Sequence, residues 1–95
     1  MNYALRPARP TDLPYVVDTW IKSARSPHER LRDATGRVRA IIAQPTTTLV
    51  VACLPDDDDA ILGWACHTPD KMYSYVRRGA RDQGLEKALT ESMHT

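Results

Sequence analysis

Two continuous runs of apolar and β-branched residues constrain the fold of this chain more than any other feature. Residues 47–54 read TTLVVACL and residues 60–66 read AILGWAC, with Pro55 and four consecutive aspartates between them. Unbroken runs of this length are typical of strands buried on both faces, and the short polar segment between them indicates a hairpin. We therefore expect a buried hairpin whose acidic turn faces solvent.

The flanking segments predict the remaining elements. Residues 3–6 form a short extended run before Pro7, and the segment that begins at Met72 and ends at Arg77 alternates as a strand does. Three other stretches repeat apolar residues with helical spacing. The resulting order β-α-α-β-β-β-α predicts an α+β fold with a mainly antiparallel four-stranded sheet and helices packed on it. The helical stripes consist of Leu13, Val16, Val17, Trp20 and Ile21, then Leu31, Ala34, Val38, Ile41 and Ile42, and last Leu85, Ala88, Leu89 and Met93.

Two helix starts carry recognisable capping residues. Thr11 precedes the first stripe as a candidate N-cap, and Asp12 favours the positive end of that helix. Ser26 and Glu29 have the spacing of a capping box, with Pro27 at the first helical position. We therefore expect the second helix to begin at this box.

Length and charge exclude several classes of protein. A chain of 95 residues has room for a single domain, residues 1–95. With 13 Lys and Arg against 12 Asp and Glu, it lacks the excess of positive charge expected of a nucleic-acid partner. No stretch approaches the roughly 18 consecutive apolar residues of a membrane helix, and the N-terminal residues do not resemble a signal peptide. The sequence predicts a cytoplasmic protein.

The two cysteines are expected to be reduced and buried. In a hairpin that turns at Pro55, Cys66 opposes about Leu49, which places it on the order of 13 Å from Cys53 and beyond disulfide reach. The aspartate run lacks the spacing of a calcium loop, and Cys66 and His67 have no second pair of ligands. We therefore predict no metal site.

Positive residues gather before the last helix. Arg77, Arg78 and Arg81 precede it, and Gly79 and Gly84 allow backbone N–H groups to point outward. Such an arrangement is typical of an anion cradle at a helix N-terminus.

The segment from Tyr73 to Leu85 resembles the fourth strand and phosphate-binding loop of the GNAT acetyltransferase family. Residues 3–14 resemble the first strand and helix of that family, and residues 61–64 its third strand, so the resemblance covers nearly the whole chain. The start is most similar to small GNAT-like proteins of phages and prophages. The family fold continues with a further strand, a helix and a hairpin, so the resemblance implies a truncated GNAT-like domain.

The resemblance also implies which residues would meet a cofactor. In the family this loop and the helix after it hold the pyrophosphate of acetyl-CoA, and the fourth strand lines the pantetheine. Asp82 and Glu86 depart from the loop pattern and place negative charge beside the expected anion. The positions that would contact acetyl-CoA are Val76, Arg77, Arg81, Gln83, Gly84 and Leu85.

Two functions remain open at this point. The first is a binding or inhibitor module without catalysis, which would hold no cofactor and would meet a second protein chain, its own copy or a host protein, through the strand from Met72 to Arg77. The second is a minimal N-acetyltransferase that uses acetyl-CoA and completes its site by self-association. Tyr73 and Tyr75 are candidates for proton transfer in the second case and for packing or partner contact in the first.

Overall fold

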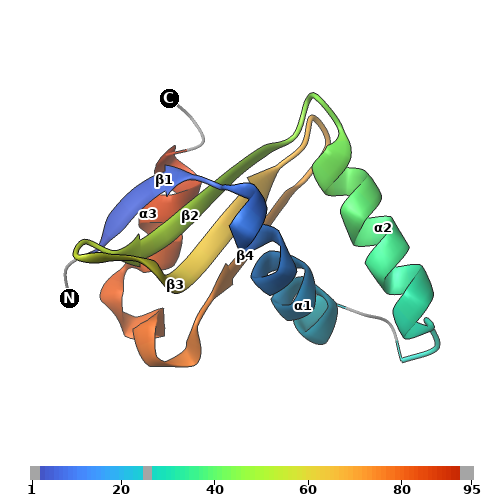
Figure 1. Cartoon of the computed structure of the whole chain (residues 1–95), viewed down its shortest axis with the longest axis horizontal. Coiled ribbons are helices and arrows are strands. Elements are labelled where there is room, and N and C mark those ends of the chain that lie inside the picture. Colours follow the sequence, from blue (N-terminus) through green and yellow to red (C-terminus); the bar gives the residue numbers. More distant parts are fainter. Residues whose placement is uncertain (1–2, 25–26, 93–95) are drawn as a thin grey trace.

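A computed structural model describes residues 3–24 and 27–92 of the chain. The elements follow the predicted order, with two short 3-10 turns added before the first and last helices (Figure 1). This confirms the α+β arrangement. The elements are β1 (Ala4–Pro7), η1 (Pro10–Asp12), α1 (Leu13–Ala24), α2 (Leu31–Ala43), β2 (Thr48–Leu54), β3 (Asp57–His67), β4 (Met72–Val76), η2 (Arg78–Gln83) and α3 (Leu85–Ser92).

The four strands form one antiparallel sheet in the order β1-β2-β3-β4. The two apolar runs become β2 and β3 at its centre, and β4 lies at one edge. Each central strand has a partner on both sides. β4 ends at Val76, one residue before the predicted end. The N–H of Arg77 makes a last bond to Leu62, and the chain then turns into η2.

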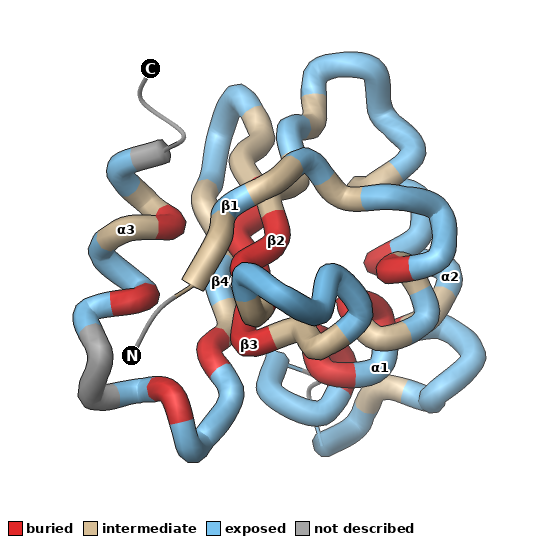
Figure 2. The backbone as a smooth tube through the Cα atoms, turned by 60° about the vertical axis from the view of Figure 1, so that its left-hand side comes forward, coloured by how far each residue is buried: buried red, intermediate tan, exposed pale blue. Residues whose placement is uncertain are grey.

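Helices cover both faces of the sheet. α1 and α2 lie on one face, and α3 lies on the other (Figure 1). Figure 2 shows the buried segments in β2 and β3 and on parts of α1, α2 and α3. The first face packs Trp20 and Val38 against Trp64, and the second packs Leu85 and Leu89 against Ala65.

The first helix starts in a different way from the one predicted. The 3-10 turn η1 begins at Pro10 with Arg9 at its N-cap position, so that Thr11 lies exposed inside the turn and the predicted Thr11 cap is wrong. The Asp12 carboxylate closes the turn by accepting a hydrogen bond of 2.7 Å from the backbone N–H of Arg9. Asp12 also accepts two bonds from the Arg6 guanidinium, at 2.6 and 3.0 Å.

The second helix begins later than predicted. Helix α2 starts at Leu31, and residues 27–29 form a turn ahead of it, so the predicted helix start at the capping box is wrong. Ser26 lies outside the described residues. The Glu29 carboxylate instead accepts two bonds of 3.1 Å from Arg37, in the second turn of α2. Leu31 is 59% exposed, so it does not join the core as its spacing predicted.

No helix in the described ranges is long and apolar enough to cross a membrane.

The central hairpin confirms the predicted register. Cys66 pairs with Leu49, Cys53 pairs with Ile61, and both cysteines are buried and unpaired. Burial raises the pKa of the Cys66 thiol to about 11. The acidic turn is shorter than predicted because β3 already begins at Asp57. Asp58 is tied to the N-terminal segment, since its carboxylate lies 2.9 Å from the Arg9 guanidinium and its carbonyl accepts a bond of 2.7 Å from Arg6.

Gly63 occupies a position where β3 and β4 approach too closely for a side chain. A Cβ atom at residue 63 would lie 2.6 Å from the backbone oxygen of Tyr75 and 3.1 Å from the Cα of Val76. We expect Gly63→Ala to lower the free energy of unfolding by about 1–3 kcal/mol, because the ladder must shift. Denaturant titration measures the change. The control is Gly36→Ala in α2, where nothing lies within 4 Å and the helix should gain about 0.5–1 kcal/mol. Equal effects of the two substitutions would contradict the close approach.

Candidate functional site

The outer edge of β4 presents backbone groups that no strand of the described chain covers. Arg77 N–H bonds to the Leu62 carbonyl at 2.7 Å, and Thr68 N–H bonds to the Lys71 carbonyl at 2.9 Å. Opposite residues of an antiparallel pair alternate between bonded and non-bonded sets. The odd-numbered residues of β4 therefore bond to β3. The N–H and C=O groups of the three even-numbered residues point away from the sheet, and these are Met72, Ser74 and Val76.

Tyr73 and Tyr75 lie on the α1 side of this edge, and both are half-buried. The Tyr73 ring packs 4.6 Å from Trp20, and the Tyr75 ring stacks 6.2 Å from Trp64. The structure thus gives both tyrosines a packing role on the helical face. Their predicted part in proton transfer stays a prediction.

Arg81 turns back onto the edge strand. Its Nε donates a hydrogen bond of 3.1 Å to the carbonyl oxygen of Val76, one of the outward groups of β4. The segment after β4 makes this return possible because η2 is a tight turn closed by a bond of 2.8 Å from Ala80 N–H to the Arg77 carbonyl. The Arg81 guanidinium, which was predicted to bind a phosphate, therefore forms a hydrogen bond with a backbone carbonyl of β4.

The start of α3 carries the predicted backbone donors and a competing carboxylate. Gly84 has φ of +70°, a left-handed conformation that glycine adopts without strain, and α3 follows at once. The first α-helical bond runs from Ala88 N–H to the Gly84 carbonyl, which leaves the N–H groups of residues 85–87 without an intrahelical partner. Glu86 lies among them, and its carboxylate accepts a bond of 3.3 Å from the Ser74 hydroxyl.

A cavity of about 280 Å³ joins these groups at the sheet edge. It reaches from the end of α1 to the start of α3. Its charged lining is one guanidinium and one carboxylate, so the cavity offers an anion no excess of positive charge. It is lined by Ser23, Ser74, Tyr75, Val76, Arg81 and Glu86.

The predicted cofactor positions are only partly brought together. Val76 and Arg81 line the cavity, but the Val76 side chain is buried against α3 and only its backbone faces outward. The Leu85 side chain is also buried, so Leu85 can offer a ligand only its N–H. The Arg77 side chain lies in a different cavity, beside Tyr15 and Ile61. Gln83 lies in η2, next to Gly84.

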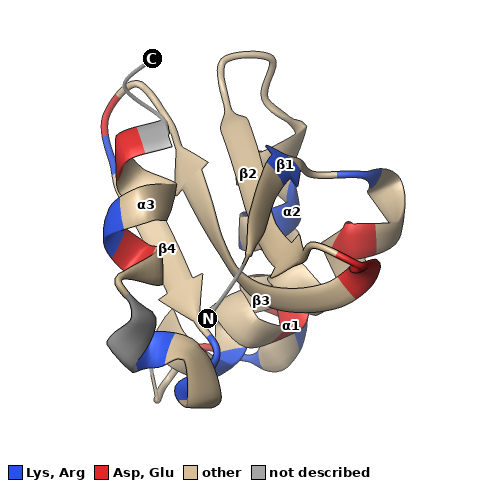
Figure 3. Cartoon of the chain, turned by 90° about the vertical axis from the view of Figure 1, so that its left-hand side faces the viewer, with Lys and Arg blue, Asp and Glu red and all other residues tan. Residues whose placement is uncertain are grey.

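Figure 3 shows how charge is distributed at this end of the molecule. Basic segments follow the turn below β4, and an acidic and a basic segment follow each other on α3. Glu86 and Lys87 are these neighbours at the helix start. The positive end of α3 is thus balanced by an acidic side chain in its first turn.

Sequence reasoning missed two serines of the edge cavity. Ser74 alternates with the two tyrosines and so lies on the opposite face of β4, a position that strand alternation could have indicated. Ser23 comes from the exposed end of α1, and no local pattern connects it with β4. Within residues 3–24 and 27–92, no three His, Cys, Asp or Glu side chains are grouped so that they could hold a metal ion.

Comparison with solved structures identifies the fold. A possible acetyltransferase from Clostridium difficile superimposes with a TM-score of 0.71 at 16% identity, over 99% of this chain and 70% of that one. A putative GNAT acetyltransferase from Desulfovibrio desulfuricans gives 0.63 at 22% identity, over 97% and 63%. A GNAT acetyltransferase from Streptococcus pneumoniae gives 0.61 at 14% identity, over 97% and 64%.

These similarities confirm that the chain has a GNAT-like fold, as the sequence resemblance implied. The chain spans about two thirds of the length of these structures. No family model matches the sequence, and no curated protein matches it.

Proposed function

We propose that this chain is a GNAT-like binding module that does not transfer acetyl groups, and that two copies of it associate through the free edge of β4. The observation that carries the proposal is the state of that edge. The carbonyl of Val76 is held by Arg81 at 3.1 Å, while the outward groups of Met72 and Ser74 have no strand beside them in the described chain. The edge is therefore closed near the phosphate loop and open along its first half.

Two features weigh against acetyl-CoA as the ligand of this edge. A pantetheine chain that ran along β4, as the family resemblance implies, would compete with Arg81, which already donates a bond to the Val76 carbonyl. A pyrophosphate at the start of α3 would meet the Glu86 carboxylate, which repels it. Each feature is expected to weaken binding of the cofactor.

A second copy of β4 suits the open part of the edge. Two β4 strands paired antiparallel about a two-fold axis would exchange bonds through their outward N–H and C=O groups. Unpaired edges of this kind readily accept a strand from another chain. The cysteines are unpaired and buried, which is the state expected in a reducing compartment, and we propose that the module acts in the cytoplasm.

The substitution Ser74→Pro tests the association. It removes one outward N–H and leaves the β3 ladder intact, because the N–H of Ser74 faces away from β3. We expect wild-type protein to dimerise with rising concentration in light scattering and sedimentation, and Ser74→Pro to weaken the dimer at least about tenfold, the effect of losing about 1.4 kcal/mol.

Ser74→Ala is the matched control. It removes the hydroxyl bond to Glu86 but keeps the outward N–H, so it should dimerise like the wild type. A strictly monomeric wild type at high concentration, or a Ser74→Pro variant that associates as well as Ser74→Ala, would contradict pairing through β4.

A further inference from the structure

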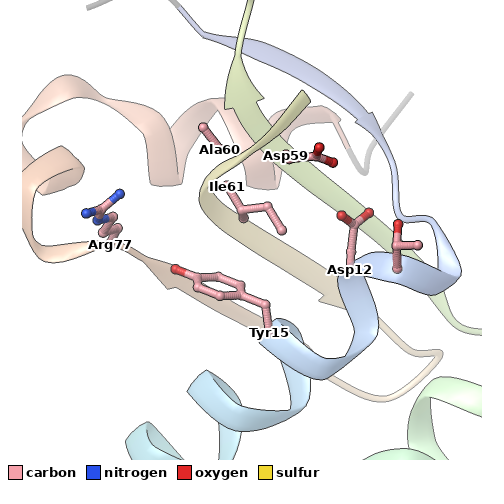
Figure 4. A pocket seen from close by; sticks show the side chains of 7 residues that line it. Asp12, Tyr15, Asp59, Ala60, Ile61 and Arg77 are labelled. Atoms are coloured by element: carbon pink, nitrogen blue, oxygen red, sulfur yellow. The ribbon is translucent and has the colours of Figure 1, made fainter. Parts of the chain in front are cut away.

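A second cavity lies where β3 begins and β4 ends, and none of its lining residues lines the edge cavity. It measures about 650 Å³. Three segments far apart in the sequence build it: the start of α1, the start of β3 and the residue after β4 (Figure 4). It is lined by Thr11, Asp12, Tyr15, Asp59, Ala60, Ile61 and Arg77.

Two charges in this cavity have no partner among the described residues. The Asp12 carboxylate is used by Arg6, whose guanidinium binds it at 2.6 and 3.0 Å, and by the N–H of Arg9 at 2.7 Å. Asp59 and Arg77, in contrast, make no side-chain hydrogen bond or ion pair with other residues that the structure describes. Within that part of the chain, the Asp59 carboxylate and the Arg77 guanidinium can therefore both bind a ligand.

These two charges lie at opposite ends of the cavity. Figure 4 shows Arg77 at one end and Asp59 at the other, with the ring of Tyr15 and the side chain of Ile61 between them. The Tyr15 hydroxyl points toward the Arg77 end. Burial is the main cause that raises the pKa of Tyr15, Tyr75 acts in the same direction and Arg77 opposes it. The hydroxyl is therefore protonated at neutral pH and can donate a hydrogen bond beside the guanidinium.

The sheet register offsets the two charged residues along the strand direction. Arg77 lies opposite Leu62, to which its N–H bonds at 2.7 Å, and Asp59 precedes Leu62 by three residues. The pairing of β3 with β2 is irregular over these residues, so the two backbone positions are offset by at most about 10 Å. A single α-amino acid carries both charges on one carbon, whereas a short peptide carries them at its two ends.

We infer that this cavity binds a zwitterion whose ammonium and carboxylate groups are separated, as at the two ends of a short peptide. Asp59 receives the ammonium group. Arg77 and the Tyr15 hydroxyl receive the carboxylate, and the Tyr15 ring with Ile61 and Ala60 contacts the middle of the ligand. This site does not depend on the β4 edge, so its occupancy is separate from the association proposed above.

The test is a titration of the full chain with triglycine, followed by amide chemical shifts in NMR. We expect saturable shifts at Asp59, Ile61 and Arg77. N-acetyl-triglycine lacks the ammonium and triglycine amide lacks the carboxylate, and each should bind at least about tenfold more weakly because one charged hydrogen-bonded contact is lost. Glycine should bind more weakly than triglycine. Comparison with an ω-amino acid, 8-aminooctanoate, shows whether the peptide groups of triglycine increase the affinity beyond that of the two charged ends.

Substitutions identify which end each charge serves. Asp59→Asn should abolish the difference in affinity between triglycine and its N-acetyl form. Arg77→Gln should abolish the difference in affinity between triglycine and its amide. Asp70→Asn and Arg78→Gln remove exposed charges that do not line the cavity and should change neither difference. The inference is overturned if wild-type protein shows no saturable shifts, if glycine binds as well as triglycine, or if blocking the peptide termini has no effect.

Discussion

Replacing Asp12 with Ala is expected to lower the free energy of unfolding by about 3–5 kcal/mol, as removal of one partner from a buried ion pair does. The side chains of Arg6 and Asp12 are 12% and 4% exposed and lie 2.6 Å apart, so the substitution leaves the Arg6 charge buried. It also removes the acceptor for the Arg9 N–H that starts the first helical turn. Because a domain of this size is stable by only about 5–15 kcal/mol, denaturant titration should show a large shift of the midpoint.

The same residue should make stability depend on pH. The two hydrogen bonds from Arg6 lower the pKa of the Asp12 carboxyl, and the N–H of Arg9 acts in the same direction. The ionised carboxylate therefore stabilises the fold above its unfolded pKa of about 3.9, and this contribution is lost as the pH falls through the lower folded pKa. Asp12→Asn should flatten the acid limb of the stability profile.

Asp58→Ala is the control for both experiments. Asp58 also pairs with an arginine, at 2.9 Å, but its side chain is 57% exposed, so its loss should destabilise the fold far less than the loss of Asp12. Equal destabilisation by Asp12→Ala and Asp58→Ala would contradict the assigned burial of the Arg6 pair.

Replacing Trp64 with Ala should cost a similar amount, about 3–5 kcal/mol, the range for removing a large aromatic side chain from a core. Trp64 is 1% exposed and stacks 5.1 Å from Trp20 and 6.2 Å from Tyr75. Its Nε1 donates a bond of 2.9 Å to the buried hydroxyl of Thr19. Thermal or denaturant unfolding measures the loss, and near-UV circular dichroism should lose the signal of the stacked tryptophans.

Substitution of Thr19 distinguishes the contribution of the Trp64 hydrogen bond to stability from that of Trp64 packing. Thr19→Val leaves the indole N–H buried without an acceptor and should cost about 1–3 kcal/mol. In a Trp64→Phe background no N–H remains, so the same substitution should cost clearly less. If Thr19→Val costs the same in both backgrounds, the hydrogen bond does not stabilise the fold.

The order of the elements along the chain and the hairpin register could be predicted because local patterns fix them. The apolar runs marked β2 and β3, and the single proline and aspartate turn between them set Cys66 opposite Leu49. The helix starts could not be predicted, because long-range contacts decide them. Asp12 closes the first turn onto Arg9 and is bound by Arg6 on β1. Helix α2 begins only at Leu31, and Glu29 ahead of it bonds to Arg37. The local sequence is compatible with the predicted start as well as with the observed start of each helix.

The candidate site was predicted in part for the same reason. The family resemblance implied that Val76, Arg81 and Gly84 would lie near one another, and the first two do line one cavity. Sequence spacing could not show that Arg81 folds back onto Val76, since that depends on the tight 3-10 turn after β4. Nor could it separate Arg77 from the others, because this requires knowing which face of the sheet each side chain takes.

The proposed function depends on whether the edge of β4 binds acetyl-CoA. Calorimetric titration of the wild-type protein with acetyl-CoA measures this directly. Glu86→Ala should give detectable binding where the wild type gives none if the carboxylate is an obstacle. For the wild type we predict no saturable heat up to millimolar acetyl-CoA, since Arg81 holds the Val76 carbonyl and Glu86 lies at the start of α3. A dissociation constant in the low micromolar range would contradict the account and favour an acetyltransferase completed by self-association.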